Sequence, residues 1–262
     1  MTDAPVDKAP LLSHLIELRQ RLVIAVVTIL VMFIGCYTIS EHIFGFLVQP
    51  LRDIIGPDAK MIYTSLQEAF FTYLKVAFFS GLFLALPMVF TQIWLFVAPG
   101  LYQHEKRTIL PFLLLTPVLF FTGGALAYLF VFPLAFKFFL GFVTPTIEAL
   151  PSLKEYLNLV IKLIFAFGIA FEMPLGLLLM VKTGLITTAG LVKKRKYSIV
   201  IAFVAAAILT PPDPFTQVFL ALPLLTMYEI AIIGGRMIEK KREAHKLEEA
   251  AEDAARLKKD AE

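Results

Sequence analysis

Long apolar segments separated by short polar ones dominate the chain. They are continuous runs rather than alternating patterns, and five are long enough to cross a hydrocarbon core, which takes about 20 residues as a helix. A sixth run of 12 residues is short, because at about 1.5 Å per residue it reaches only about 18 Å. The pattern predicts an all-α integral membrane protein with six transmembrane helices, at residues 22–39, 70–98, 109–132, 157–181, 198–209 and 215–233.

Composition agrees with this class. Hydrophobic residues make up 58% of the 262 residues, and charged residues only 17%. A membrane β-barrel would instead show short segments of alternating hydrophobicity. The net charge of +3 gives no case for nucleic acid, and Cys36 is the single cysteine. The four histidines are too scattered for a metal site, so we expect no metal and no cofactor.

Basic residues predict the orientation. In the six-helix topology, eighteen Lys and Arg residues fall on the side of the N-terminus and four on the other side. The positive-inside rule therefore places both termini in the cytoplasm. We expect an amphipathic cytoplasmic helix at 1–21 that lies along the interface before it turns into the first span. A membrane domain at 22–235 and a charged cytoplasmic tail at 236–262, either a solvated helix or disordered, follow.

The region around the short fifth helix departs from an ordinary bundle. It is followed by a stiff proline-rich turn, Thr210-Pro211-Pro212-Asp213-Pro214, through which no helix can run. We expect the hairpin to end below the membrane surface unless the bilayer thins locally.

Two acidic residues on the cytoplasmic side are candidate ligands for a cationic partner. Glu17 lies on the polar side of the N-terminal helix, and Glu105 lies in the predicted loop after the second span. From spacing alone, a surface pair between Glu17 and Arg21 and a favourable helix-dipole position for Glu105 are the simpler interpretations. Together, however, two carboxylates would suit a ligand with two basic groups.

Glu172 is a stronger candidate, because an ionisable residue within a span is costly and often functional. It shares a helix face with Gly168 and Gly176, which would let another helix approach. Three interpretations stay open: a neutral carboxyl bonded inside the bundle, a docking point for a partner helix, or a proton site. Pro174 should weaken the helix nearby. The sequence shows no phosphate-binding loop, no HExxH and no nucleophile motif, so we do not expect an enzyme.

Several segments, in this order along the predicted topology, resemble the TatC family, the receptor subunit of the twin-arginine protein translocase. Individually they are unspecific, but their order and placement are specific, and they cover nearly the whole chain up to about Arg236. The segments are Ser13–Arg19, Phe96–Tyr102 with His104-Glu105, Phe171–Pro174, Lys194–Tyr197, and Leu209–Asp213 with Gln217.

The resemblance implies a glove-shaped concave bundle with short helices five and six in a bacterial inner membrane. It implies that the cytoplasmic face binds the twin-arginine signal peptides of folded proteins through Glu17, Arg19 and Glu105, and that Glu172 lines the concave face. With Gln217, Glu172 would form a polar docking point for partners. Implied partners are TatA-like and TatB-like single-span subunits, further copies of the chain, and the protonmotive force as driver. We assign structural roles to Pro50, Phe96, Pro99, Pro174, Pro211, Pro212 and Asp213.

Two other functions stay open from the residues. A secondary transporter of a small solute or ion could use Glu172, although the spans lack the repeat symmetry common in that class. A non-catalytic scaffold for other helices could use the face with Gly168 and Gly176.

Overall fold

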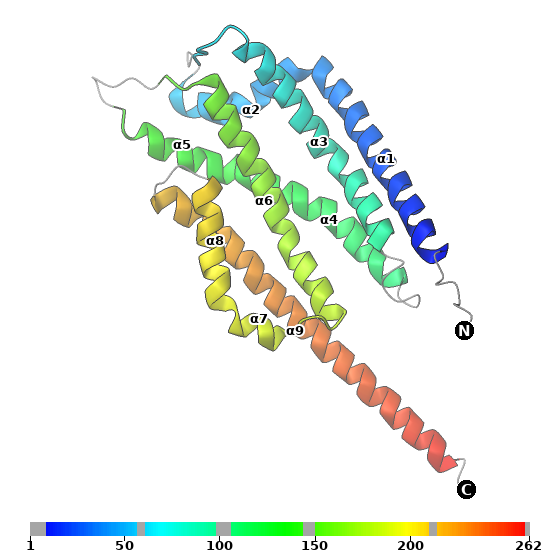
Figure 1. Ribbon diagram of the computed structural model, residues 1–262. Coiled ribbons are helices and arrows are strands. Elements are labelled where there is room, and N and C mark those ends of the chain that lie inside the picture. The colour runs from blue at the N-terminus through cyan, green and yellow to red at the C-terminus, as the bar shows by residue number, and fades with distance from the viewer. Residues whose placement is uncertain (1–8, 57–60, 98–105, 144–149, 210–213, 260–262) are drawn as a thin grey trace, which may run out of the picture. The chain divides into compact units, whose positions relative to one another are not determined.

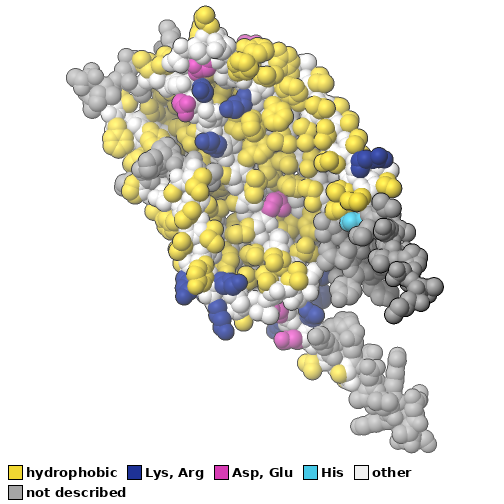
Figure 2. Space-filling model, viewed as in Figure 1, with side chains coloured by type: hydrophobic (Ala, Val, Ile, Leu, Met, Phe, Trp, Pro, Cys, Tyr) yellow, Lys and Arg dark blue, Asp and Glu magenta, His cyan; other side chains and the backbone are white. Residues whose placement is uncertain are grey.

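The computed structural model describes residues 9–56, 61–97, 106–143, 150–209 and 214–259, and nearly all of them are helical (Figure 1). This confirms the all-α prediction. The chain divides into two compact units, Met1–Gly168 and Ile169–Glu262. Five helices are long and apolar enough to cross a membrane among the described residues. Hydrophobic side chains cover most of the face shown in Figure 2, as expected for surfaces in contact with lipid.

The first helix, α1 (Ala9–Thr38), is continuous. The turn that we expected between an interfacial helix and the first span is therefore absent. The physical reason lies in the sequence, because neither proline nor glycine occurs between Pro10 and Gly35 and nothing interrupts the helical hydrogen bonds.

The first unit packs α1 against α3 (Glu68–Val97), and the two helices run side by side in Figure 1. They approach closely at Gly81, where a Cβ atom would lie 2.6 Å from the backbone of Phe33. Between them in sequence lies α2 (Ser40–Ile55), which our sequence analysis missed. It is too short to span a bilayer and its apolar positions lie on one face, so it does not show as a long apolar run.

The third predicted span ends later than expected. Helix α4 (Lys106–Leu126) continues through a π-helical turn, η3 (Ala127–Val131), into α5 (Phe132–Leu140). The predicted end at residue 132 was therefore wrong by about two turns. The wide turn accommodates Pro133, which cannot donate to the helical ladder.

Helix α6 (Leu153–Lys182) begins beside the segment that leads into α3. The backbone N–H of Ile62 donates to Pro151 O at 3.1 Å, and Leu153 N–H donates to Ile62 O at 2.9 Å. These bonds fix the starting ends of α3 and α6 next to each other. Farther along, aromatic rings of Phe83, Phe120 and Phe165 pack together in the core of the unit.

The second unit contains the end of α6 with α7 (Thr188–Lys193), α8 (Arg195–Leu209) and α9 (Pro214–Lys259). Helix α8 has 15 residues, which confirms a short fifth apolar helix. The prediction of a short sixth helix was wrong, since α9 has 46 residues and runs into the charged tail. The tail residues Glu, Lys, Arg and Ala all favour a helix, so no break follows the apolar part.

Candidate functional site

Glu17 lies near the end of α1 that packs beside the end of α3. Its Oε1 lies 3.3 Å from Nη2 of Arg21, one helical turn away, and both side chains are about one-third exposed. Nη1 of Arg21 donates to Oε1 of Gln92, a buried residue of α3, at 3.3 Å. The guanidinium thus links the carboxylate of α1 to α3 and holds it where solvent still reaches it.

A ring contact fixes the same pair of helix ends. His14 of α1 stacks on Phe96 of α3, with ring centroids 4.4 Å apart and an angle of 19° between the planes. Phe96, to which we assigned a structural role, thus joins the ends of α1 and α3 through its ring. Arg19 is exposed on α1. We refer to His14, Glu17, Arg21, Gln92 and Phe96 as the α1–α3 cluster.

Some predicted site residues cannot be placed. Glu105 lies outside the described residues, directly before the first residue of α4 in the sequence. Four further predicted residues also lie outside the described residues: Pro99, Pro211, Pro212 and Asp213.

Glu172 is half-buried in α6, within the second unit. The two glycines expected to flank it on an open face differ. At Gly168 a Cβ would lie 2.4 Å from the ring of Phe120, so this glycine already serves packing inside the chain, whereas at Gly176 no atom lies within 4 Å. Only Gly176 of the pair offers open space for another helix. Pro174 is buried inside α6 without ending it.

Gln217 links two helices of the second unit. Its Nε2 donates to the carbonyl oxygen of Phe203 in α8 at 3.0 Å, so it ties the start of α9 to α8. This bond uses one of the two N–H donors of its amide. Pro50 is buried inside α2, where it helps form the apolar face of that helix.

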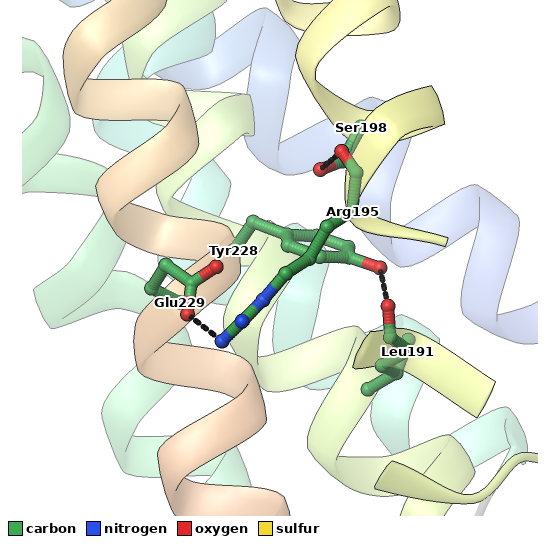
Figure 3. Close-up of polar contacts among 5 residues, drawn as sticks. All are labelled: Leu191, Arg195, Ser198, Tyr228 and Glu229. Carbon is green, nitrogen blue, oxygen red and sulfur yellow. Dashed lines mark hydrogen bonds and ion pairs between the residues drawn. The ribbon is translucent and has the colours of Figure 1, made fainter. Parts of the chain in front are cut away.

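An ion pair in the second unit was missed by sequence reasoning. Nη2 of Arg195, at the start of α8, lies 2.6 Å from Oε2 of Glu229 in α9, as Figure 3 shows. Beside it, the hydroxyl of Tyr228 donates to Leu191 O in α7 at 2.8 Å. Glu229 is the single acidic residue within the predicted sixth span. That signal, an ionisable group inside an apolar run, could have identified it.

A second missed carboxylate, Glu239, holds the middle of α9 against α7. The backbone N–H of Thr188 donates to Oε1 of Glu239 at 2.8 Å, and its hydroxyl donates to Oε2. Thr187 caps α7 by accepting from Gly190 N–H. The two short helices α7 and α8 and the long α9 are thereby joined by polar contacts, in addition to the apolar cluster of Val181, Leu191, Tyr228 and Ile232.

Glu68, at the start of α3, is a third missed carboxylate. It accepts from the backbone N–H of Thr64 at 2.9 Å and from the backbone N–H of Lys154 in α6 at 3.2 Å. It thereby satisfies a free N–H group at the N-terminus of α6. Within the described residues no group of three or more His, Cys, Asp or Glu side chains could hold a metal ion.

Comparison with known proteins identifies the family. Residues 13–223 match the model of the family described as Sec-independent protein translocase protein (TatC). The curated TatC protein of Magnetococcus marinus is 69% identical over 248 residues, which cover 95% of this chain and 90% of that protein. The protein of Escherichia coli K12 is 37% identical over 230 residues, covering 88% of this chain and 89% of the relative.

A solved structure of a twin-arginine translocase receptor, TatC, superposes with a TM-score of 0.76 at 41% identity. It covers 86% of this chain and 99% of the solved chain. Another structure of such a receptor, in a detergent, matches with a TM-score of 0.77 at 42% identity. The helices and motifs described above, together with these matches, show that the chain belongs to the TatC family of Sec-independent protein translocases, the receptor component of twin-arginine translocation.

Proposed function

We propose that this multi-pass membrane receptor binds the twin-arginine signal peptides of folded proteins with the α1–α3 cluster and with Glu105, which follows α3 in the sequence. The observation that supports this most is the state of Glu17. Its carboxylate is partly exposed and is held by a guanidinium of the chain itself at 3.3 Å. An incoming arginine could take the same place, because guanidinium and carboxylate form paired, charge-assisted hydrogen bonds.

The second arginine of the motif would need a second carboxylate nearby. Glu105 suits this role because α3 ends at Val97 and α4 begins at Lys106, so the residue follows the end of the helix that carries Phe96 and Gln92. Arg19, exposed two residues after Glu17 on α1, would bind acidic or carbonyl groups of the peptide.

The proposal includes six crossings with both termini in the cytoplasm. Five long helices are joined by the 15-residue α8 as a short sixth crossing. The excess of Lys and Arg on the side of both termini supports the orientation. It places the α1–α3 cluster at the cytoplasmic face, where a newly made protein presents its signal peptide.

Single-span TatA-like and TatB-like subunits, and further copies of this chain, complete the proposed assembly, which the protonmotive force would drive. Open space at Gly176 near the half-buried Glu172, and Gln217 between α8 and α9, are the features that support helix docking in the second unit. Membership of the TatC family removes the ground for the secondary-transporter alternative.

The test is binding of a labelled twin-arginine signal peptide to the full chain in membrane vesicles, followed by photo-crosslinking. Glu17→Ala combined with Glu105→Ala should lower peptide affinity by roughly a hundredfold, as expected for two charge-assisted bonds of about 1.5 kcal/mol each. Glu155→Ala, which removes an exposed glutamate at the start of α6, is the matched control and should leave binding unchanged. Unchanged crosslinking in the double variant would contradict the proposal.

A further inference from the structure

Two cavities lie next to each other along α3 and α6 in the first unit. The first, of about 640 Å³, has polar and charged groups in its wall, and we call it the lysine cavity. The second, of about 530 Å³, is almost entirely apolar, and we call it the aromatic cavity. Phe79 of α3 lines both, and α6 passes from Asn158 in the first to Ile161 in the second within one turn. A polar chamber thus adjoins an apolar one.

Two lysines face the lysine cavity from different helices. Lys75 comes from α3 and Lys154 from the first turn of α6. Nζ of Lys75 donates to Oδ1 of Asn158 at 2.5 Å, so its position is fixed by α6 while other N–H donors stay available. Lys162 follows on the same face of α6, four residues after Asn158, and is exposed.

These cations are in an unusual place for lysine. All three lie within helices that are long and apolar enough to cross a membrane, where a charged group is costly unless it reaches a polar partner. Side chains of a helix lean toward its N-terminus. Because α3 and α6 begin side by side, these lysines lean toward one shared end, as lysines in a span do when their charged groups reach toward the lipid headgroups. In Figure 2, Lys and Arg side chains lie over this end together with Asp and Glu side chains.

The carboxylate in the same cavity does not cancel this charge. Glu68 is buried and accepts three hydrogen bonds, from the backbone and hydroxyl of Thr64 and from the backbone of Lys154. Both of its oxygens are therefore hydrogen-bonded at the starts of α3 and α6, and against the two lysines it supplies a single negative charge. In the part of the chain that the structure describes, neither Lys75 nor Lys154 forms an ion pair.

We propose that the two cavities together bind one anionic phospholipid. Its phosphate would contact the ammonium groups of Lys75 and Lys154 in the lysine cavity, and an acyl chain would lie in the aromatic cavity against Phe79, Phe83 and Phe165. A ligand with both parts fits the pair of cavities best. A free anion would not need the apolar cavity, and an uncharged apolar molecule would not need the lysines. In the orientation proposed above, this lipid belongs to the outer leaflet. By contacting both helices, it would stabilise the packing of α3 against α6.

The experiment measures lipid binding to the purified full chain by native mass spectrometry. The probes are phosphatidylglycerol, phosphatidylcholine with the same acyl chains, and glycerol 3-phosphate, which has the anionic group without chains. We expect phosphatidylglycerol to bind roughly thirtyfold more tightly than phosphatidylcholine, from about 1 kcal/mol for each of two lysines. Lys75→Gln with Lys154→Gln should remove this preference, and Lys75→Arg with Lys154→Arg should retain it.

Two further variants control for folding and for the acyl chain. Lys137→Gln removes an exposed lysine of α5 that lines neither cavity and should change nothing. Ser80→Phe, which narrows the aromatic cavity, should weaken the binding of both lipids and leave the ratio of their affinities unchanged. Equal binding of the two lipids by the unchanged chain would overturn the proposal, as would a preference that survives loss of both lysines. Glycerol 3-phosphate that binds as tightly as phosphatidylglycerol would show a site for free phosphate and overturn it too.

Discussion

Among the residues that the structure describes, two ion pairs join a glutamate to an arginine, and their difference separates binding from folding. Glu17 and Arg21 lie one turn apart on α1, at 3.3 Å. Arg195 and Glu229 lie on different helices, 34 residues apart in sequence, at 2.6 Å. Breaking the first pair leaves α1 intact, because the backbone already fixes its residues. Breaking the second removes a link between α8 and α9. The looser, local pair is therefore the one suited to exchange its partner for a ligand.

The largest effect on stability should come from reversing a charge in the interhelical pair. Arg195→Glu would place two carboxylates where an ion pair now stands and should lower the free energy of unfolding by about 2 kcal/mol, after discounting for the exposure of both side chains. Adding Glu229→Arg should restore most of the loss. The check is thermal unfolding in detergent or nanodiscs, and a double variant as unstable as the single one would refute a direct pair.

Glu17→Gln should mainly lower peptide affinity, whereas Arg195→Glu should mainly lower stability. The amide retains the shape of the side chain but loses its charge, so affinity for a twin-arginine peptide should fall about tenfold, or about 1.4 kcal/mol. Stability should change by no more than a few tenths of a kcal/mol, the usual worth of a local helix pair. Peptide titration and thermal unfolding of the same preparation test both parts. A large loss of stability with unchanged affinity would reverse the roles given to the two pairs.

The smallest effect is expected for Arg21→Gln. It frees Glu17 from its intramolecular partner, so peptide affinity should rise about twofold, because a competing local pair of about 0.4 kcal/mol is removed. Lys193→Gln, at an exposed position of α7, is the control for a general loss of positive charge. If Arg21→Gln weakened peptide binding, Arg21 would be holding the carboxylate in its binding position and not competing for it.

Much of the fold followed from the apolar pattern. The bounds expected for the second and fourth spans, 70–98 and 157–181, differ little from α3 and α6, because long apolar runs leave no other structure in a membrane. The pattern failed where a helix is amphipathic, as in α2, or where it continues through a proline or into charged residues, as at Pro133 and in the tail of α9. Hydropathy indicates which residues contact lipid. A helix can continue beyond those residues, so its ends do not follow from hydropathy alone.

The candidate site, like the fold, could be predicted from the sequence only in part. The sequence by itself determined the membrane class, the asymmetry of basic residues and, through the order of its motifs, the family, and it predicted Glu17 and Phe96 as site residues. Only the tertiary structure decided that Phe96 stacks on His14, that Phe120 fills the space beside Gly168, and that Glu68 and Glu229 join separate helices. The reason is that class and family depend on composition and order along the chain. The partner of a side chain instead depends on how helices distant in sequence pack together.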